Sequence, residues 1–347
     1  LNPLVGWFYS RYSKQSGLLA AVMLAVLTTF AYGALHGFWI LFVARCLWGT
    51  AWSFLRLGGF LTIIDTATDK NRGEFIGTYN GLWGLGLLGG MLIGGGLVDF
   101  VGIFPVTSAF SLLALMTIPF VLRYVPVEPA KKGPTSTSPS LAFRHIFRHR
   151  HVWSVMTIGF MLAMLFFGVF MSTLCRMIET THGQTVDLFM FTAGAATLSG
   201  LLQALKWGWE PFLAPLVGRL TDRFGNRQLI LTVVLILTGI LFVLTSVIQQ
   251  PWIWILIILV VLLFSTVLIT LTDALATTTA SQYGKVEVMT TYTVVTDVGA
   301  AAGPLIAYLV GAWLGFANLY VLLGGLLLIF AVAWSKMERK FLSSSNK

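Results

Sequence analysis

The sequence predicts an all-α membrane protein made of two pseudo-symmetric helix bundles. Its 347 residues are 57% hydrophobic and only 10% charged, with a mean hydropathy of +0.85, whereas about a quarter of the residues in a soluble domain are charged. Apolar runs of about 20 residues recur along the chain, each long enough to cross about 30 Å of hydrocarbon. A short segment near the N-terminus recurs 212 positions later, as in transporters built from two related halves.

About ten of the apolar runs are expected to be complete membrane-spanning helices. A helix rises about 1.5 Å per residue, so each run is long enough to cross the bilayer. In chain order they lie near residues 17–36, 38–62, 76–97, 103–124, 152–174, 188–217, 229–248, 252–273, 290–312 and 314–335.

The basic residues predict the orientation of these helices. Of the 22 Lys and Arg, all but four fall in segments that the predicted spans place on one side of the membrane. The exceptions are Arg176 in an opposite loop and Arg45, Arg56 and Lys206 within spans. Because cytoplasmic loops carry such an excess, both chain ends are expected in the cytoplasm, in the inner or plasma membrane. The net charge of +9 is therefore attributed to topology and not to nucleic-acid binding.

Residues 125–150 are predicted to be a cytoplasmic linker between the two bundles. The segment begins with Pro, Ser and Thr residues, which favour a mobile chain, and ends in the basic run R-H-I-F-R-H-R over 144–150. The basic run is expected to form a helix on the anionic inner leaflet. This linker divides the chain into an N-terminal bundle, 1–124, and a C-terminal bundle, 151–347.

The repeated segment reads P-L-V-G-R-L-T-D-R-F-G-N-R over 215–227 and P-L-V-G-W-F-Y-S-R-Y-S-K over 3–14. The spacing of Gly218, Asp222, Arg223 and Arg227 resembles the cytoplasmic loop signature of the major facilitator superfamily, found between helices 2 and 3 and between helices 8 and 9. The resemblance implies the major facilitator fold and a role for this loop in separating the inward- and outward-facing states. Asp222 and Arg223 are expected to pair with each other, with a helix terminus or with the neighbouring bundle.

The first copy of the loop departs from this pattern. It keeps Gly6 and Arg11, but Ser10 stands in the Asp position and Ser13 in that of the second Gly. The gating contacts of the two halves are therefore expected to be unequal.

The two halves also differ in what precedes the loop. The copy at 215–227 follows two spans after the linker, whereas the copy at 3–14 opens the chain. We therefore expect an N-terminal truncation of a twelve-helix protein that lacks helix 1, nearly all of helix 2 and about 55–65 residues. A natural ten-helix protein is the alternative.

Two arginines within one span are candidate pathway residues. Arg45, with Gly49 and Ala51, resembles the family pattern Arg-x-x-x-Gly-x-Gly, and Arg56 follows about three turns later on the same helix face. A guanidinium inside a span is costly unless it faces a wet cavity or an acid. The pair would suit an anionic substrate or a proton-linked carboxylate; the alternative is a structural tie to backbone carbonyls.

Two glycine patterns resemble the antiporter signature Gly-x-x-x-Gly-Pro-x-x-Gly-Gly. Glycines at this spacing let another helix approach closely. The first pattern has Met91 in place of Pro, which weakens the implied antiport, whereas the second keeps the Pro. The residues are Gly86, Gly90, Gly94 and Gly95 in the first, and Gly299, Gly303 and Pro304 in the second.

A third group of candidates lies in the run 188–217 and near residue 297. Lys206 and Glu210 are spaced i,i+4 and can pair on one helix face, near the middle of the bilayer. Glu210 is a candidate proton acceptor, with Gln203 beside it, and Asp297 is a second candidate acid. A static ion pair that locks helix packing is the alternative. Asp65 and Asp273 are interpreted as helix-end residues and not as ligands.

These features predict a secondary active transporter that alternates access between two bundles around a midplane site. The glycine pattern favours proton-coupled export of a small amphipathic or drug-like compound by a monomer in the lipid bilayer. Uptake of an anionic metabolite and a non-transporting sensor or fragment are alternatives. No cofactor or metal is expected, and an enzyme is disfavoured, because Cys46 and Cys175 are isolated in apolar runs and no nucleophile–base pair has usable spacing.

Overall fold

Helix contacts divide the chain differently from its sequence halves. The computed structural model describes residues 2–68, 70–125, 150–188, 191–224 and 227–345. The first unit comprises Leu1–Thr68, Gly86–Val152 and Ala276–Val294, and the second comprises Asp69–Leu85, Trp153–Leu275 and Val295–Lys347. Each half of the sequence thus contributes one segment to the other unit. The predicted linker lies almost entirely outside the described residues.

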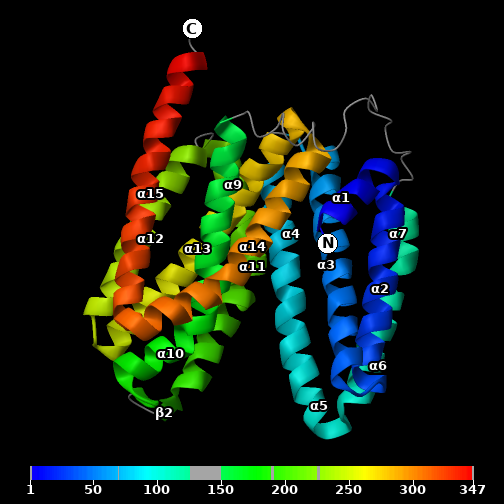
Figure 1. Ribbon diagram of the computed structural model, residues 1–347, viewed down its shortest axis with the longest axis horizontal. Helices are drawn as coiled ribbons and strands as arrows, with labels where there is room; N and C mark the ends of the chain where they lie inside the picture. The colour runs from blue at the N-terminus through cyan, green and yellow to red at the C-terminus, as the bar shows by residue number, and fades with distance from the viewer. Residues whose placement is uncertain (1, 69, 126–149, 189–190, 225–226, 346–347) are drawn as a thin grey trace. The chain divides into compact units, whose positions relative to one another are not determined.

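In the first unit, α2 packs against both α3 and α6 (Figure 1). Ser13 begins α2 by accepting a hydrogen bond from the Ser16 N–H, and Gly37, at φ 110°, makes the turn into α3. The Ser111 hydroxyl donates to the carbonyl of Val26 at 2.9 Å and fixes α6 on α2. The helices are α1 (Asn2–Arg11), α2 (Lys14–Ala34), α3 (Phe38–Thr66), α5 (Gly95–Val101), α6 (Ile103–Leu115) and α7 (Ile118–Tyr124), with a π-helical turn η1 (Gly90–Gly94) before α5.

The second unit contains the larger apolar core. Its α12 and α15 lie side by side, with Gly239 against the Gly324 carbonyl (Figure 1), and Phe242 stacks on Tyr320 between them. The elements are α9 (Arg150–Leu162), η2 (Ala163–Phe170), α10 (Met171–His182), β1 (Thr185–Leu188), β2 (Phe191–Gly194), α11 (Ala195–Phe224), α12 (Arg227–Val247), α13 (Pro251–Tyr283), α14 (Lys285–Leu314) and α15 (Phe316–Ser345).

The helices α4, α13 and α14 continue across the unit boundaries, and the first three residues of α9 also belong to the first unit. The helix α4 (Arg72–Gly89) belongs to the second unit up to Leu85, and α14 belongs to the first unit up to Val294. These crossing segments bring the loop copies and the predicted ion pair into contact with helices from the other half of the sequence.

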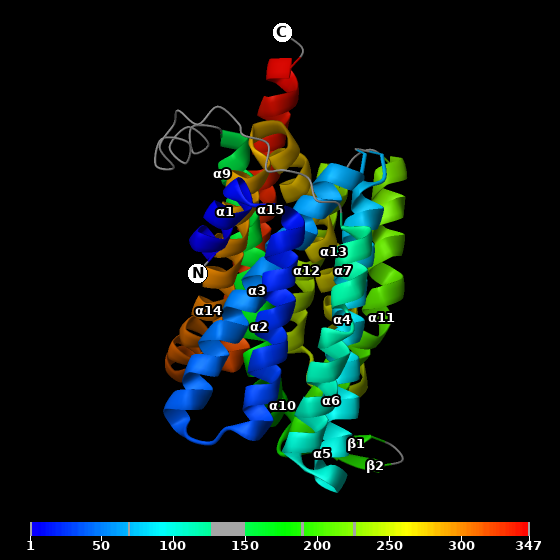
Figure 2. The ribbon, with the colours of Figure 1, turned by 90° about the vertical axis from the view of Figure 1, so that its right-hand side faces the viewer.

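Eight helices within the described residues are long and apolar enough to cross a membrane. The other two predicted spans correspond to α4 with its continuation through η1 and α5, and to α11. The count of ten spans therefore stays a prediction. The predicted span at 188–217 begins too early, because Thr185–Leu188 and Phe191–Gly194 form the antiparallel strands β1 and β2, and α11 starts only at Ala195 (Figure 2).

Candidate functional site

A stripe of glycines on α4 lets its backbone approach that of α11. Gly73, Gly77, Gly81 and Gly84 are spaced four, four and three residues apart, so they share one face of the helix. A Cβ atom on Gly81 would lie 2.6 Å from the Cα of Pro211, and one on Gly77 would overlap the carbonyl of Ala214. Small residues at such spacing are typical of closely packed membrane helices.

Lys206 and Glu210 form a buried ion pair beside this contact. The Nζ of Lys206 lies 2.9 Å from Oε2 of Glu210, and the two side chains are 1% and 3% exposed. The predicted i,i+4 pairing is therefore present in the structure. The ammonium also lies 3.7 Å from the ring centroid of Trp207, and Trp83 packs edge-on against Trp207 with centroids 5.0 Å apart. Aromatic faces of this kind attract a desolvated cation.

The helix α4 joins Asp273 to the same buried cluster. The Nδ2 of Asn80 donates to Oδ2 of Asp273 at 2.9 Å, and a Cβ on the neighbouring Gly81 would lie 3.1 Å from the Glu210 carbonyl oxygen. The interpretation of Asp273 as a helix-end residue is wrong, because it is buried and lies ten residues before α13 ends at Tyr283.

The other predicted pathway residues are distributed over both units. Gln203 lies one turn from Lys206 on α11 and donates to the Ser199 hydroxyl at 3.2 Å. Asp297 is half-buried on α14 in the second unit. Arg45 is exposed on α3 in the first unit, and the half-buried Arg56 guanidinium lies 6.0 Å from the Phe60 ring centroid. A pathway that includes all of these residues stays a prediction.

The second loop copy binds the start of α4 through Asp222. Its carboxylate accepts hydrogen bonds from the backbone N–H groups of Gly73 at 3.2 Å and Glu74 at 3.1 Å. These N–H groups carry the positive end of the helix dipole, which an acidic side chain stabilises. The Arg227 guanidinium donates to the same carboxylate at 2.5 Å. Asp222 therefore binds a helix terminus, which is one of its three expected kinds of partner.

Two further contacts close this junction. Gly218 lies directly against the backbone of Gly73, where a Cβ atom would overlap the Gly73 carbonyl. Arg219 pairs with Glu74 at 2.7 Å. Arg223, which was expected to contribute, has an exposed side chain.

The first loop copy contacts the start of α14 in a similar way but without an acid. Gly6 packs against Thr290, where a Cβ atom would overlap the threonine hydroxyl. Ser10 donates to the Trp7 carbonyl in its own helix at 2.7 Å, and Arg11 lies 5.0 Å from the Trp7 ring centroid. The predicted inequality of the two loop copies is therefore visible in their contacts.

The predicted glycine patterns have different outcomes. A Cβ atom on Gly86 or Gly90 would meet no described atom within 4 Å, and close helix contact at these two positions stays a prediction. A Cβ atom on Gly94 would lie 3.1 Å from the Phe110 ring, and the surroundings of Gly95 lie outside the described contacts. Gly299 and Gly303, which precede Pro304 in α14, do pack against the backbone at Phe160 and Gly168.

Long apolar helices, close contacts at glycines and a buried ion pair are together typical of a multi-pass integral membrane protein. Within the described ranges, no group of three or more His, Cys, Asp and Glu side chains could hold a metal ion. The sequence profile of the Major Facilitator Superfamily matches residues 1–210 and 211–346. The chain therefore belongs to this family of transporters, which confirms the resemblance of its loop signature.

The chain is similar to curated and solved transporters over nearly its whole length. It is 24% identical to the multidrug resistance protein MdtG of Salmonella arizonae, over 99% of this chain and 83% of that protein. It is 25% identical to MdtG of Dickeya zeae, over 98% and 81%. The crystal structure of the human organic anion transporter MFSD10 (TETRAN) has a TM-score of 0.76 at 17% identity, over 96% of this chain and 80% of that chain. A crystal structure of the E. coli fucose:proton symporter FucP has a TM-score of 0.70 at 10% identity, over 95% and 86%. The structural likenesses show the fold.

Proposed function

We propose that this protein is a secondary active transporter that exports a small amphipathic or drug-like compound in exchange for protons. Export is supported by the multidrug resistance proteins to which the whole chain is similar. Proton coupling is supported by one observation above all, the buried ion pair of Lys206 and Glu210. The protein would work as a monomer in the inner membrane, with about ten spans present and both ends in the cytoplasm.

Glu210 is the proposed proton-binding group. Burial of an unpaired charge is costly, whereas a paired charge is tolerated. A proton on Glu210 would neutralise the carboxylate and leave the Lys206 ammonium without its counterion. The protonated cluster would therefore favour an arrangement in which water or a substrate reaches Lys206. Such a difference in free energy between two arrangements is what couples a proton to alternating access.

Purified protein in liposomes tests this function. Ethidium, a cationic amphipath, and deoxycholate, an anionic one, serve as probes, and an internal pH dye follows protons. Probe movement that drives proton movement in the opposite direction supports the proposal. Probe movement without proton flux contradicts the coupling, and inward movement of deoxycholate together with protons would favour uptake of anions.

Replacing Asp222 by Asn is expected to lower the maximal transport rate by about fivefold while leaving the half-saturating probe concentration unchanged. The charge at the start of α4 contributes about 0.3–1 kcal/mol to such a contact, and 1 kcal/mol is about fivefold in a rate. Only one state of the cycle would lose stabilisation, so turnover would suffer more than binding. The measurement is the initial rate in liposomes over a range of probe concentrations.

Ser10→Asn is the matched control, because Ser10 occupies the same position in the first loop copy and its hydroxyl donates to the Trp7 carbonyl of its own helix. It should leave the maximal rate unchanged. Equal losses in both variants, or an unchanged rate in Asp222→Asn, would count against the gating role of Asp222.

A further inference from the structure

Aromatic rings lie against the ammonium of Lys206 in the second unit. The centroids of the Trp207 and Phe167 rings are 3.7 Å and 5.8 Å from its Nζ. Trp83 packs edge-on against both rings, with centroid distances of 5.0 Å to Trp207 and 6.3 Å to Phe167. The carboxylate of Glu210 contacts the same ammonium at 2.9 Å. We call the three rings the aromatic box.

Three separate elements build the aromatic box. Trp83 lies on α4, Phe167 on the π-helical segment η2 and Trp207 on α11, and all three residues belong to the second unit. A Cβ atom on Gly84 of α4 would lie 3.1 Å from Cε3 of Trp207 and 3.5 Å from Oε2 of Glu210, so a glycine there lets α4 approach the box closely. Short π-helical segments inside α-helices are frequent at functional sites.

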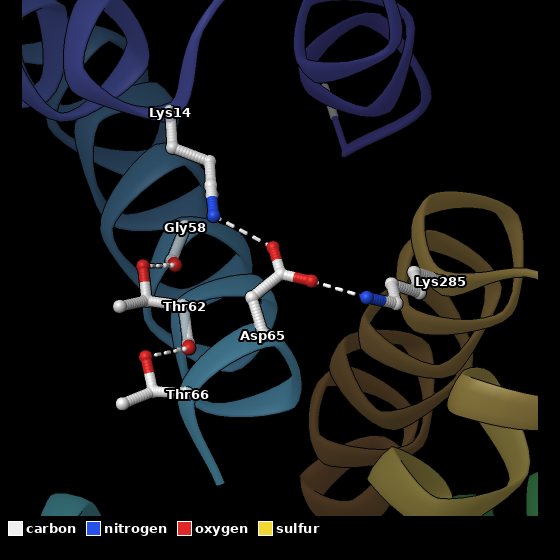
Figure 3. A network of polar contacts seen from close by, with 6 residues as sticks. All are labelled: Lys14, Gly58, Thr62, Asp65, Thr66 and Lys285. Carbon is white, nitrogen blue, oxygen red and sulfur yellow. Dashed lines mark hydrogen bonds and ion pairs between the residues drawn. The ribbon is translucent and has the colours of Figure 1, made fainter. Parts of the chain in front are cut away.

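Two lysines of the first unit are held differently. Asp65, near the end of α3, pairs with Lys14 and Lys285 at the starts of α2 and α14 (Figure 3). These two lysine side chains are 15% and 46% exposed, whereas that of Lys206 is only 1% exposed. Aromatic faces attract a cation most strongly where water is excluded. The rings therefore take the place of water around the Lys206 ammonium.

Exchange for protons determines which charge such a site should accept. If Glu210 binds the exchanged proton, the exported compound must bind more tightly when Glu210 is unprotonated, because the two ligands must oppose each other. An unprotonated carboxylate attracts a cation and repels an anion. The faces of the aromatic rings carry negative partial charge and have the same preference. The carboxylate and the aromatic box therefore select the same kind of compound.

We propose that the aromatic box and Glu210 bind the cationic group of the exported compound, an organic ammonium, in the place that the Lys206 side chain occupies. This substrate class rests on the proposed function, whereas binding of a cation in the box can be measured without transport. The compound reaches Lys206 while Glu210 is protonated and replaces it as the proton leaves. The long lysine side chain lets its ammonium move aside while α11 keeps its position.

Binding of two probes that differ only in charge tests the proposal. Benzyltrimethylammonium and neopentylbenzene have the same shape, with a quaternary nitrogen in the first and a carbon in the second. Their affinities for the purified protein are measured by calorimetry in mixed micelles, with protein-free micelles as the reference. The unmodified protein should bind the ammonium more tightly than the uncharged probe.

Lys206→Met should raise the affinity for benzyltrimethylammonium, because it removes the side chain that competes for the box and leaves the Glu210 carboxylate in place. If Lys206 fills the box for about nine-tenths of the time, the gain is about tenfold. The affinity for neopentylbenzene should change much less. A purely structural ion pair predicts no such gain, since its loss would only destabilise the protein.

Trp207→Leu should weaken binding of the ammonium by about two- to thirtyfold, the range of cation–π contacts. Trp207→Phe keeps a ring and should weaken it less. Trp313→Leu is the matched control, because the Trp313 side chain is 89% exposed on α14. This control should leave the affinities for both probes unchanged.

An unchanged or lower ammonium affinity in folded Lys206→Met would overturn the proposal. If that variant does not fold, the Trp207 variants decide, and equal losses for the charged and uncharged probes would overturn it. If the unmodified protein moves neither ethidium nor deoxycholate in liposomes, the proposed function fails, but the affinities still decide whether the box binds cations. If transport is normal and no variant changes the ammonium affinity, the proposed function stands and the box is not its binding site.

Discussion

Replacing Glu210 by Gln is expected to abolish proton-coupled transport and to destabilise the protein. The variant leaves the Lys206 ammonium buried without its carboxylate, only 3.7 Å from the centre of the Trp207 ring. Breaking a buried pair by removing one partner costs about 3–5 kcal/mol. The measurements are proton-driven ethidium transport in liposomes and the midpoint of unfolding in mixed micelles. A stable Glu210→Gln variant with normal coupling would contradict both parts.

A second variant separates proton binding from simple packing. Lys206→Met with Glu210→Gln removes both charges and keeps the side-chain volumes similar. Apolar replacement of a buried ion pair is often neutral or stabilising by about 1–4 kcal/mol, so the unfolding midpoint should recover. Transport should stay absent if Glu210 carries the proton. Recovery of coupled transport in this double variant would instead support a static ion pair.

The exposed pair of Arg176 and Glu179 on α10 is a matched control. It has a similar distance of 2.7 Å, but the side chains are 55% and 32% exposed. Glu179→Gln should cost at most about 1 kcal/mol, because water screens the pair, and should leave proton coupling intact. A loss in Glu179→Gln as large as in Glu210→Gln would mean that burial does not control the effect.

Local spacing predicted the part of this site that lies within one helix. Lys206 and Glu210 are one turn apart in α11, so the side chains had to share a face whatever the rest of the fold did. For Asp222 the loop signature left Arg223, a helix terminus and the neighbouring bundle open as partners. Its partner could not be chosen from the sequence, because the start of α4 lies 148 to 149 residues away in the chain.

Asp273 is a second residue whose partner could not be read from the sequence. Its position at the end of the predicted span 252–273 suggested a helix end, but α13 continues past it to Tyr283. Asn80, which donates a hydrogen bond to it, lies 193 residues away in the chain. The hairpin β1–β2 was missed because its residues continue the apolar pattern of α11. In both cases tertiary packing decided what hydropathy alone left open.

The glycines of α4 have different surroundings along one helix. The sequence singled out Gly86 and Gly90 for close packing, whereas the contact lies at Gly73, Gly77 and Gly81. The spacing i, i+4, i+8 of these earlier glycines was readable from the sequence. Composition cannot tell which face of a helix has a neighbour, and α4 has glycines on more than one face.

Gly77→Ala is therefore expected to be strongly destabilising, whereas Gly86→Ala in the same helix should be tolerated. The new methyl group at position 77 would overlap the Ala214 carbonyl and lie 2.7 Å from the Pro215 nitrogen. These are backbone atoms that cannot rotate away, so α4 and α11 must separate. Overpacking of this kind costs about 1–3 kcal/mol. The unfolding midpoint in mixed micelles measures the effect.

Gly86→Ala makes the comparison sharp because it adds the same methyl group to open space. Alanine in a helix interior is favoured over glycine by about 0.5–1 kcal/mol, so this variant should be unchanged or slightly more stable. Separation of α4 from α11 in Gly77→Ala should also lengthen the contacts of Asp222 with the start of α4, and transport should fall along with stability. If both alanines change the midpoint equally, the close contact is not what holds these helices together, and the junction that positions Glu210 and Asp222 would have to be stabilised elsewhere.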